Sequence, residues 1–382
     1  MVRLPGVQSI LKHVTFTFDD SSKQIKLNME EIITFEMKYT RNSPVICGVF
    51  IFRDLLDILG SIDIKQCSIE VYFNDHYNGN FLRRFKVLEM AEAYSQNRSK
   101  AYSLFLVDEI SYALNNIFIS KSFSGSRVEA FKMILQEYKI NDLISKNSLK
   151  SDFASDASQN NQSFVLSTNM SFLDFFIAEF ERIGYSFYQT RDGIYIKSYD
   201  DLLPGKLPEI TDEFVQECSN QIYKNIILEV NNIPGSNAAA LANPNKKSYY
   251  FDENQKKMVP IVDTFDTLKG DLALNNDVRN LQSNSGTKAA FQNRADNAQH
   301  KNQIRESYLE TFKVEIYVNG FVQNDINKIY NVQLQGHKGT VKTQIEGNVI
   351  SSGKFVGLSV TDKIIGDKLI QRIVLGRSDS QK

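Results

Sequence analysis

Histidine is the side chain most often used for metal binding and for proton transfer near neutral pH, and this sequence has four of them. His13, His76, His300 and His337 show no ligand-like spacing among themselves or with the cysteines. We therefore expect structural or surface roles for all four, and the sequence predicts no metal site.

Carboxylates occur as adjacent pairs, at Asp19-Asp20, Glu30-Glu31 and Asp200-Asp201. A glycoside hydrolase needs two separated carboxylates that face one cleft. Adjacent pairs in turns or at strand ends are usually solvated instead. We interpret the three pairs as solvated and predict no catalytic residue.

Motifs for phosphate binding and nucleophilic catalysis are absent from the sequence. The chain lacks GxxxxGK[ST] and GxSxG, and its glycines do not form GxGxxG between a strand and a helix. Phe123-Ser124-Gly125-Ser126 has the look of a nucleophile turn, but it opens a helix with an ordinary capping pattern. The sequence thus predicts a protein that is not an enzyme, with no cofactor-binding residue and no cofactor.

Charge gives no sign of a nucleic-acid-binding protein. The formal net charge of the 382 residues is −1, so no global basic field would attract phosphates. Local basic doublets are more often solvated faces than binding sites, although they would matter if repeated around a symmetric ring. These doublets are Arg83-Arg84, Lys246-Lys247 and Lys256-Lys257.

Composition indicates a globular, strand-rich protein. Apolar residues make up 42% and charged residues 23%, and 26 Phe and 17 Tyr occur without any Trp. Cys47, Cys67 and Cys218 form no CxxC pair, and we expect free thiols buried as small apolar side chains in a reducing cytosol. No signal pattern and no run of 18 apolar residues is present, so we expect no membrane insertion.

Residues 13–107 alternate as strands do. Val14, Phe16 and Phe18 share one face, and the same period of two recurs from Ile33 to Tyr39 and from Cys67 to Phe73. Only Phe52 to Leu59 has a helical pattern in this part of the chain. Five or six strands at this spacing predict a small barrel or sandwich over residues 1–110.

Residues 111–208 have the pattern of a small α/β unit. Apolar spacing predicts helices over 125–138 and 171–183, with an exposed polar loop over 145–163. Arg191-Asp192-Gly193 predicts a hairpin turn. The second helix could line a ligand pocket, although a helix that buries its apolar side is the commoner cause. The apolar side of the first helix comprises Val128, Phe131, Met133, Ile134 and Leu135, and that of the second Phe172, Phe175, Phe176, Ile177 and Phe180.

The remainder predicts a second barrel in two pieces, 209–234 and 308–382. A strand is expected over 221–232, and later strands over 312–318, 329–334, 353–360 and 369–375. Between them lies an insertion, 235–307, whose residues 236–245 are too poor in apolar area to favour order and whose residues 287–308 can form a helix. The predicted fold class is therefore α+β and β-rich, with two similar antiparallel β-barrels, a small α/β domain and an inserted helical and loop excursion.

The order of these elements resembles the central hub protein of phage contractile-tail baseplates, of the T-even phage type, and the N-terminal part of type VI secretion spike proteins. Four passages carry the resemblance: residues 81–88, residues 126–138, the stretch MSFLDFFIAEFERIGYSFYQTRDGIYI from Met170 to Ile196, and the strands from Tyr317 to Arg377. The likeness spans nearly the whole chain, except residues 236–286.

The resemblance implies a non-enzymatic virion component, assembled in the host cytoplasm into the tail baseplate. It implies a homotrimer whose six barrels seat a hexameric tail tube or tube initiator on one face and a trimeric spike on the other. Other baseplate proteins would be further partners, and DNA would pass through the channel only in transit.

Three alternatives remain open at this point. The chain could be the hub of a contractile injection or secretion device. It could also be a tail-associated cell-wall-degrading protein, although no separable catalytic segment is visible. Finally, it could be a tail-associated glycan-binding protein, although the absence of Trp removes the best stacking side chain.

Overall fold

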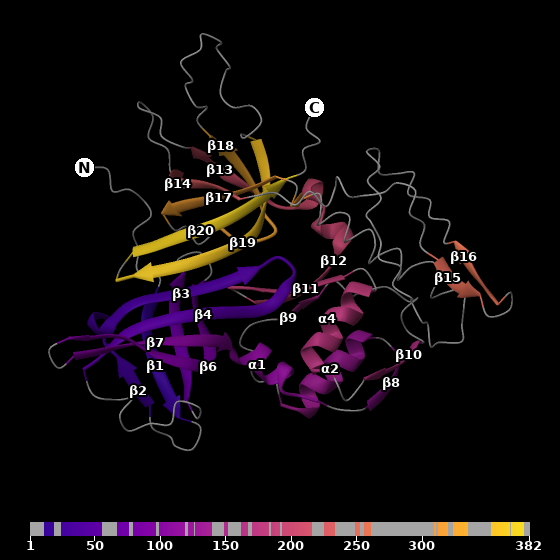
Figure 1. The fold of residues 1–382 in the computed structure, drawn as a ribbon, viewed down its shortest axis with the longest axis horizontal. Coiled ribbons are helices and arrows are strands. Elements are labelled where there is room, and N and C mark those ends of the chain that lie inside the picture. Colours follow the sequence, from indigo (N-terminus) through magenta and orange to yellow (C-terminus); the bar gives the residue numbers. More distant parts are fainter. Residues whose placement is uncertain are drawn as a thin grey trace, which may run out of the picture.

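A computed structural model of the chain describes residues 11–18, 24–55, 67–75, 79–96, 99–118, 121–125, 127–139, 149–151, 162–166, 170–182, 185–191, 193–215, 225–233, 249–252, 256–260, 309–310, 312–319, 324–334, 353–366 and 368–377. Figure 1 shows a strand-rich molecule in which indigo N-terminal strands lie beside yellow C-terminal strands, with the helices to one side.

The first part of the chain folds as strands, as its alternation predicts. In the strand Ile32–Thr40, Phe35, Met37 and Tyr39 are fully buried on one face. We call the strands β1 to β7 the N-terminal strand set; they pair in the order β3-β4-β7-β6-β5-β1-β2. Their bounds are β1 Leu11–Phe18, β2 Gln24–Leu27, β3 Ile32–Thr40, β4 Ser43–Asp54, β5 Cys67–Asp75, β6 Gly79–Gln96 and β7 Ser99–Asp108, with a 3-10 turn at Met29–Glu31.

The helix expected over 52–59 is wrong at its beginning. Phe52 belongs to β4 and lies opposite Tyr102 of β7. The physical reason is that the buried side chains of β4, Ile46, Phe50 and Phe52, keep a period of two up to this point. Residues 56–59 lie outside the described residues.

The middle of the chain forms the α/β unit. Its core gathers the phenylalanines of two helices, where the ring centroids of Phe131 and Phe176 lie 4.8 Å apart. Helix α1 follows β7 directly, and the carboxylate of Asp108 caps it by accepting from the Ser111 backbone N–H. The elements are α1 Glu109–Asn115, β8 Lys121–Gly125, α2 Arg127–Glu137, β9 Leu149–Ser151, β10 Gln162–Leu166, α4 Phe172–Arg182, β11 Tyr185–Thr190 and β12 Gly193–Ser198, followed by 3-10 turns at Tyr199–Leu202 and Pro204–Lys206.

Two expectations about this unit need correction. Met133, expected on the apolar side of its helix, is 51% exposed, because the buried side of α2 runs through Phe131, Ile134 and Leu135. The polar stretch expected as a loop over 145–163 contains β9, which pairs in parallel with β12, and the start of β10. A polar segment without apolar periodicity can still form a strand when its backbone groups pair with a neighbouring strand.

The hairpin expected at 185–196 is confirmed, as β11 pairs antiparallel with β12.

The C-terminal strand set follows. The sequence pattern predicts β14 and β17 to β20, whereas β13 was not predicted as a strand. Strands β13, β14 and β17 to β20 pair in the order β18-β13-β14-β17-β20-β19. The region expected as an insertion contains a two-stranded hairpin, whereas the helix expected over 287–308 lies outside the described residues. The bounds are β13 Glu209–Val215, β14 Asn225–Ile233, β15 Tyr249–Asp252, β16 Lys257–Pro260, β17 Phe312–Asn319, β18 Ile329–Gln333, β19 Gly353–Ile365 and β20 Lys368–Arg377.

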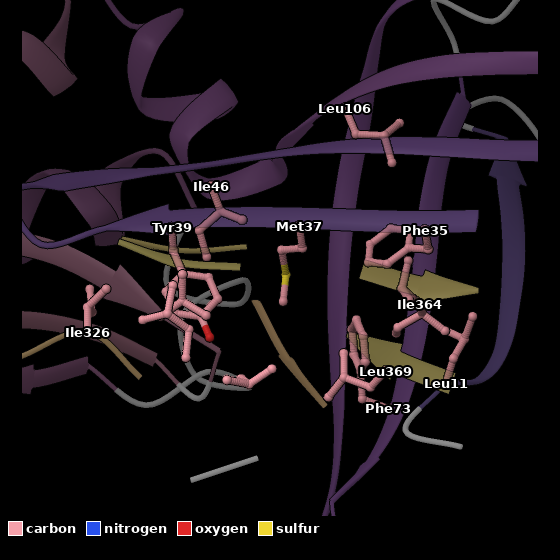
Figure 2. Close-up of a cluster of buried hydrophobic side chains, with 14 of the residues drawn as sticks. Leu11, Phe35, Met37, Tyr39, Ile46, Phe73, Leu106, Ile326, Ile364 and Leu369 are labelled. Carbon is pink, nitrogen blue, oxygen red and sulfur yellow. The ribbon is translucent and has the colours of Figure 1, made fainter. Parts of the chain in front are cut away.

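The two strand sets form one 13-stranded sheet, because β3 of the N-terminal set pairs with β19 of the C-terminal set. They also share one hydrophobic core. Figure 2 shows Ile364 and Leu369 of the C-terminal set beside Phe35, Phe73 and Leu11 of the N-terminal set. The expectation of two separate barrels is therefore not confirmed, because the two strand sets pair into one continuous sheet. The N-terminal set is open from β3 to β2, whereas β18 pairs with both β13 and β19, so that pairing in the C-terminal set returns to its first strand.

The same strand pattern nevertheless occurs twice. In the N-terminal set β3, β4, β7, β6 and β5 are neighbours in that order, and in the C-terminal set β14, β17, β20, β19 and β18 are neighbours in that order. Each pair of neighbours is antiparallel in both sets, and corresponding strands follow one another in the same order along the chain. The sixth position differs, because β1 is antiparallel to β5 whereas β13 is parallel to β18.

Candidate functional site: the junction of the two strand sets

The β3–β19 ladder joins the two strand sets over seven residue pairs, from Ser359 opposite Thr40 to Ile365 opposite Thr34. The Thr34 hydroxyl donates to the Ile364 carbonyl at 3.0 Å, and the Arg41 N–H donates to the Leu358 carbonyl at 2.8 Å. Side-chain and main-chain bonds thus add to the ladder at both of its ends.

The turn of the β11–β12 hairpin inserts into this junction. On the side of the N-terminal set, the Gln189 amide donates to Asp108 Oδ1 at 3.0 Å and to Ser111 Oγ at 3.1 Å, and it also donates to the Pro44 carbonyl. The β11–β12 hairpin is thereby bonded to the end of β7, to the start of α1 and to the start of β4.

Arg83 of β6, also in the N-terminal set, bonds the same turn. Its guanidinium donates to Gln189 Oε1 at 3.0 Å, to the Arg191 carbonyl at 3.1 Å and to the Thr190 carbonyl. The side chain is fully buried, with an exposed fraction of 1%. The expectation of a solvated Arg83-Arg84 face is therefore wrong for Arg83, because its charge is satisfied by oxygens of a segment over 100 residues away. Arg84 forms an ion pair with Glu70 at 2.6 Å.

Arg191 of the turn reaches the C-terminal set. Its guanidinium binds the Asp362 carboxylate through two bonds, of 2.7 Å from Nε to Oδ2 and 3.1 Å from Nη2 to Oδ1. The same Nη2 group donates to the Tyr39 hydroxyl at 2.8 Å and to the Asn324 carbonyl at 3.1 Å. Both charged side chains are nearly inaccessible, at 6% and 4% exposure.

Asp362 is held from its other side by amides. The Gln371 amide donates to Asp362 Oδ1 at 2.8 Å, and the Asn324 amide donates to Gln371 Oε1 at 2.8 Å. We call Tyr39, Arg83, Gln189, Arg191, Asp362 and Gln371 the polar junction. Because every member has bonding partners inside the fold, it satisfies the condition under which buried polar groups specify one arrangement.

Electrostatics keep the Arg191 guanidinium charged. Burial by itself would lower the pKa of Arg191, but Asp362 and the Tyr39 hydroxyl outweigh it, so that the pKa lies above its ordinary value. Burial raises the pKa of Tyr39 well above its ordinary value, Arg191 opposes that shift and Asp362 adds to it. Tyr39 is therefore a neutral hydrogen-bond donor and acceptor rather than a proton-transfer group. The junction is suited to holding the strand sets and the hairpin together, not to catalysis.

A second feature is a face of the sheet that crosses both strand sets. Directly opposite residues share a face, and one row runs through Lys86, Val107, Cys47, Lys38, Thr361, Arg372 and Tyr317. Charges of both signs lie on this face. Lys363 pairs with Glu36 across the junction, and Arg372 pairs with Glu315 at 2.5 Å.

Several sequence-predicted residues lie apart from the junction. Glu31, expected as solvated, is 3% exposed because its carboxylate accepts from the Asn28 N–H at 2.7 Å in a capping box. Asp201, by contrast, is exposed and pairs with Lys206 at 3.1 Å. His13 is half-buried and stacks on Tyr72 with ring centroids 4.1 Å apart. Burial, with Lys26 and Lys12 nearby, lowers the pKa of His13.

The cysteines divide in a way that the sequence does not predict. Cys67 is buried in the core, as expected, whereas Cys47 is exposed on the outward face of β4. In the alternation of β4, Cys47 lies on the other face of the strand from the buried Ile46 and Phe50. Glu30 and Lys256 are exposed, as expected of solvated charges. Eight further candidates lie outside the described residues: Asp19, Asp20, His76, Lys246, Lys247, Cys218, His300 and His337.

Within the described part of the chain, no three His, Cys, Asp or Glu side chains come close enough together to hold a metal ion. None of the helices there is sufficiently long and apolar to cross a bilayer.

The arrangement of these elements is similar to the fold of solved phage tail proteins and of a component of the type VI secretion system. A tail protein from Neisseria meningitidis MC58 is similar with a TM-score of 0.57 and 13% identity, over 95% of this chain and 96% of that one. The 43 kDa tail protein of prophage MuSo2 from Shewanella oneidensis is similar with a TM-score of 0.57 and 10% identity, over 96% and 98%.

The third similar structure is the E. coli c3393 protein, described as a component of the type VI secretion system with structural similarity to the T4 bacteriophage tail proteins gp27 and gp5. Its TM-score is 0.50 at 9% identity, over 95% of this chain and 76% of that one. No protein-family model and no curated protein matches the sequence. The resemblance predicted from the sequence is thus confirmed as a likeness of fold.

Proposed function

We propose that this chain is a structural, non-enzymatic component of a phage tail baseplate. It acts there as a homotrimeric central hub between the tail tube and the spike, enclosing a channel for DNA. The observation that carries the proposal is that the fold likeness to two tail proteins extends over nearly the full length of both chains. A protein that shared only one domain with these tail proteins would match them over only part of its length.

The polar junction suits this role. A subunit in a ring must keep its parts at one angle, because small errors in angle prevent closure. The junction bonds the α/β unit to both strand sets through three consecutive residues, Gln189, Thr190 and Arg191. We propose that the whole chain therefore enters assembly as one preformed body, with domains 1–110, 111–208 and 209–234 with 308–382 around an insertion at 235–307.

The face that crosses both strand sets is proposed to line the channel. Strong DNA binding follows from many phosphate contacts by Lys and Arg. On this face Arg372 and Lys363 are instead paired with Glu315 and Glu36. A wall of mixed sign lets DNA slide past without being retained.

A second candidate is the hub of a contractile injection or secretion device, favoured by the likeness to the type VI secretion component. The same ring would then connect a secretion tube to its spike. The two candidates share the subunit architecture and differ in what passes through the channel.

Electron microscopy tests the proposal. The purified chain, alone and after mixing with a candidate trimeric spike protein, should give threefold rings with a central opening, and the mixture should show one spike trimer for each ring. Particles without a central opening, or a spike that never associates, would refute the hub role. Cell-wall and glycan binding assays on the same sample test the remaining alternatives.

A further inference from the structure

The two copies of the five-strand pattern match residue by residue. In the N-terminal set a bulge in the β6–β7 ladder falls between Val87 and Glu89, and in the C-terminal set a bulge in the β19–β20 ladder falls between Gly357 and Ser359. Leu88 therefore corresponds to Leu358. Counting along the ladder from this bulge makes Met90 equivalent to Val360 and Ala91 equivalent to Thr361.

A second bulge confirms the same alignment independently. The β3–β4 ladder shifts between Ile32 and Thr34, and the β14–β17 ladder shifts between Ile227 and Glu229. Ile32 thus corresponds to Ile227, and Lys38 of β3 corresponds to Ile233 of β14. Bulges are specific features of a backbone, so two in the same register show that the strand sets are equivalent structures.

The equivalence exposes an asymmetry. Inside the chain, β3 of the first set pairs with β19 of the second. The equivalents of these strands, β14 and β6, have no such partner among the described strands. Pairing of β6 with β5 ends at Lys86, and pairing of β14 with β13 ends at Ile226. Both strands continue beyond these points and so present a sheet edge.

Exposed apolar side chains mark the β6 edge. Met90 is 41% exposed, whereas its equivalent Val360, covered at the in-chain junction, is 0% exposed. Leu88 is 60% exposed, whereas Leu358 packs against the core. Glu92 is exposed, whereas its equivalent Asp362 is 3% exposed. The open β6 edge therefore carries apolar side chains of the kind that the equivalent strand β19 covers at the in-chain junction.

The β14 edge shows the same contrast. Leu228 is 53% exposed, whereas its equivalent Ile33 is half-buried. Glu229 is exposed, whereas its equivalent Thr34 is 8% exposed. The two edges thus lack the cover that the matching strands give each other inside the chain.

We infer that β6 of one copy pairs with β14 of a second copy in an antiparallel ladder that repeats the in-chain β3–β19 ladder. Thr361 lies opposite Lys38 and Asp362 opposite Met37 within the chain. Transfer of that register places Ala91 opposite Ile233 and Glu92 opposite Asn232 of the next copy. Six strands separate β6 from β14 in the sheet of one chain, so the contact is between copies.

Such a contact is head-to-tail, because each copy offers a different strand at each end. Repeated contacts of this kind close into a ring when the rotation allows it. The inference rests on the self-assembly proposed above and specifies the surface through which it occurs. In a trimer, in-chain and between-copy ladders would alternate around six strand sets.

Disulfide cross-linking tests the register. Ala91→Cys is combined with Ile233→Cys in a background of Cys47→Ser and Cys218→Ser, and Glu92→Cys with Asn232→Cys serves as a second pair. Directly opposite residues lie within the Cα separation of about 4.4–6.8 Å that a disulfide needs. The matched control, Ala91→Cys with Val230→Cys, moves one thiol about 10 Å along the strand.

Mild oxidation should produce covalent multimers in both opposite pairs and at least tenfold less in the shifted control. Light scattering under reducing conditions tells the outcomes apart. If the reduced protein is a trimer but neither opposite pair cross-links, the β6–β14 ladder is wrong while the hub proposal stands. If the reduced protein is a monomer under all conditions, the hub proposal fails, and the ladder fails with it.

Discussion

Arg191 is one of two buried arginines in the polar junction, and its charge is paired with a carboxylate. Its charge is withdrawn from water and depends on Asp362, whose carboxylate accepts two of its bonds. Removing one partner of a buried ion pair typically costs about 3–5 kcal/mol, because the other charge remains buried without compensation. Replacing both partners by apolar side chains of similar volume is often close to neutral.

Arg191→Met should therefore lower the free energy of unfolding by about 3–5 kcal/mol. Arg191→Met combined with Asp362→Leu should recover most of that loss, as measured by urea denaturation. Lys206→Met is the control, because the Lys206–Asp201 pair is exposed and should contribute less than about 1 kcal/mol. A double variant no more stable than the single one would show that the charge pair is not the dominant interaction of Arg191.

Glu315 links stability to pH. Burial alone would raise the pKa of its carboxyl, but hydrogen bonds from Arg372, Asn231 and Tyr317 outweigh this and hold the pKa below its ordinary value. A lowered folded-state pKa stabilises the fold above the unfolded-state value and loses that contribution as the pH falls through the folded-state value.

Glu315→Gln should therefore flatten the decline of stability from about pH 5 downwards. Thermal unfolding followed between pH 3 and pH 7 measures this. Glu209→Gln is the matched control, because the Glu209–Lys354 pair lies on the surface and should leave the profile close to that of the unchanged protein. Equal acid sensitivity of the Glu315→Gln variant and the unchanged chain would contradict the assignment.

At the scale of elements, the strands could be predicted because a sheet buried on one face imposes a period of two on its side chains. Phe35, Met37 and Tyr39 show that period, and so do Phe50 and Phe52, although Phe52 was interpreted as the start of a helix. The junction could not be predicted. Arg83 and Gln189 are 106 positions apart and Arg191 and Asp362 are 171 apart, so only the folded chain brings them together.

The repeat was hidden for a related reason. Equivalent positions keep the register but few of the side chains, since a pleated core tolerates exchange among apolar residues of similar volume. Phe85 with Phe355 and Leu88 with Leu358 are identical, whereas Val107 corresponds to Gly376. Signals of this kind are visible in ladders and bulges, not in a comparison of the two sequences.

Gly376 shows how packing differs between equivalent strands. A Cβ atom at this position would collide with the Leu309 carbonyl oxygen and would lie 2.5 Å from Leu358 Cδ1. Gly376→Ala should therefore lower the unfolding free energy by about 1–3 kcal/mol, the usual cost of overpacking a core.

Gly205→Ala is the control for this prediction, because nothing lies within 4 Å of a Cβ atom at that position. Chemical denaturation of both variants provides the measurement. A Gly376→Ala variant as stable as the Gly205→Ala variant would mean that β20 can move away from Leu309 without cost.

At the scale of the whole molecule, the proposed trimer would use the two equivalent strand sets of each chain as two similar faces toward its neighbours. Such a trimer would present six near-equivalent positions, so that a threefold spike and a sixfold tube could bind to one ring. The in-chain β3–β19 ladder and the polar junction fix the relation between the two sets within each copy.

The most direct test of this account is the mass of the purified protein in solution, by light scattering after size exclusion, alone and mixed with its spike. The account predicts a particle of three times the 43.6 kDa of one chain, or a monomer that becomes a three-to-three complex when the spike is added. A stable monomer that ignores both spike and tube would contradict the proposal of a hub.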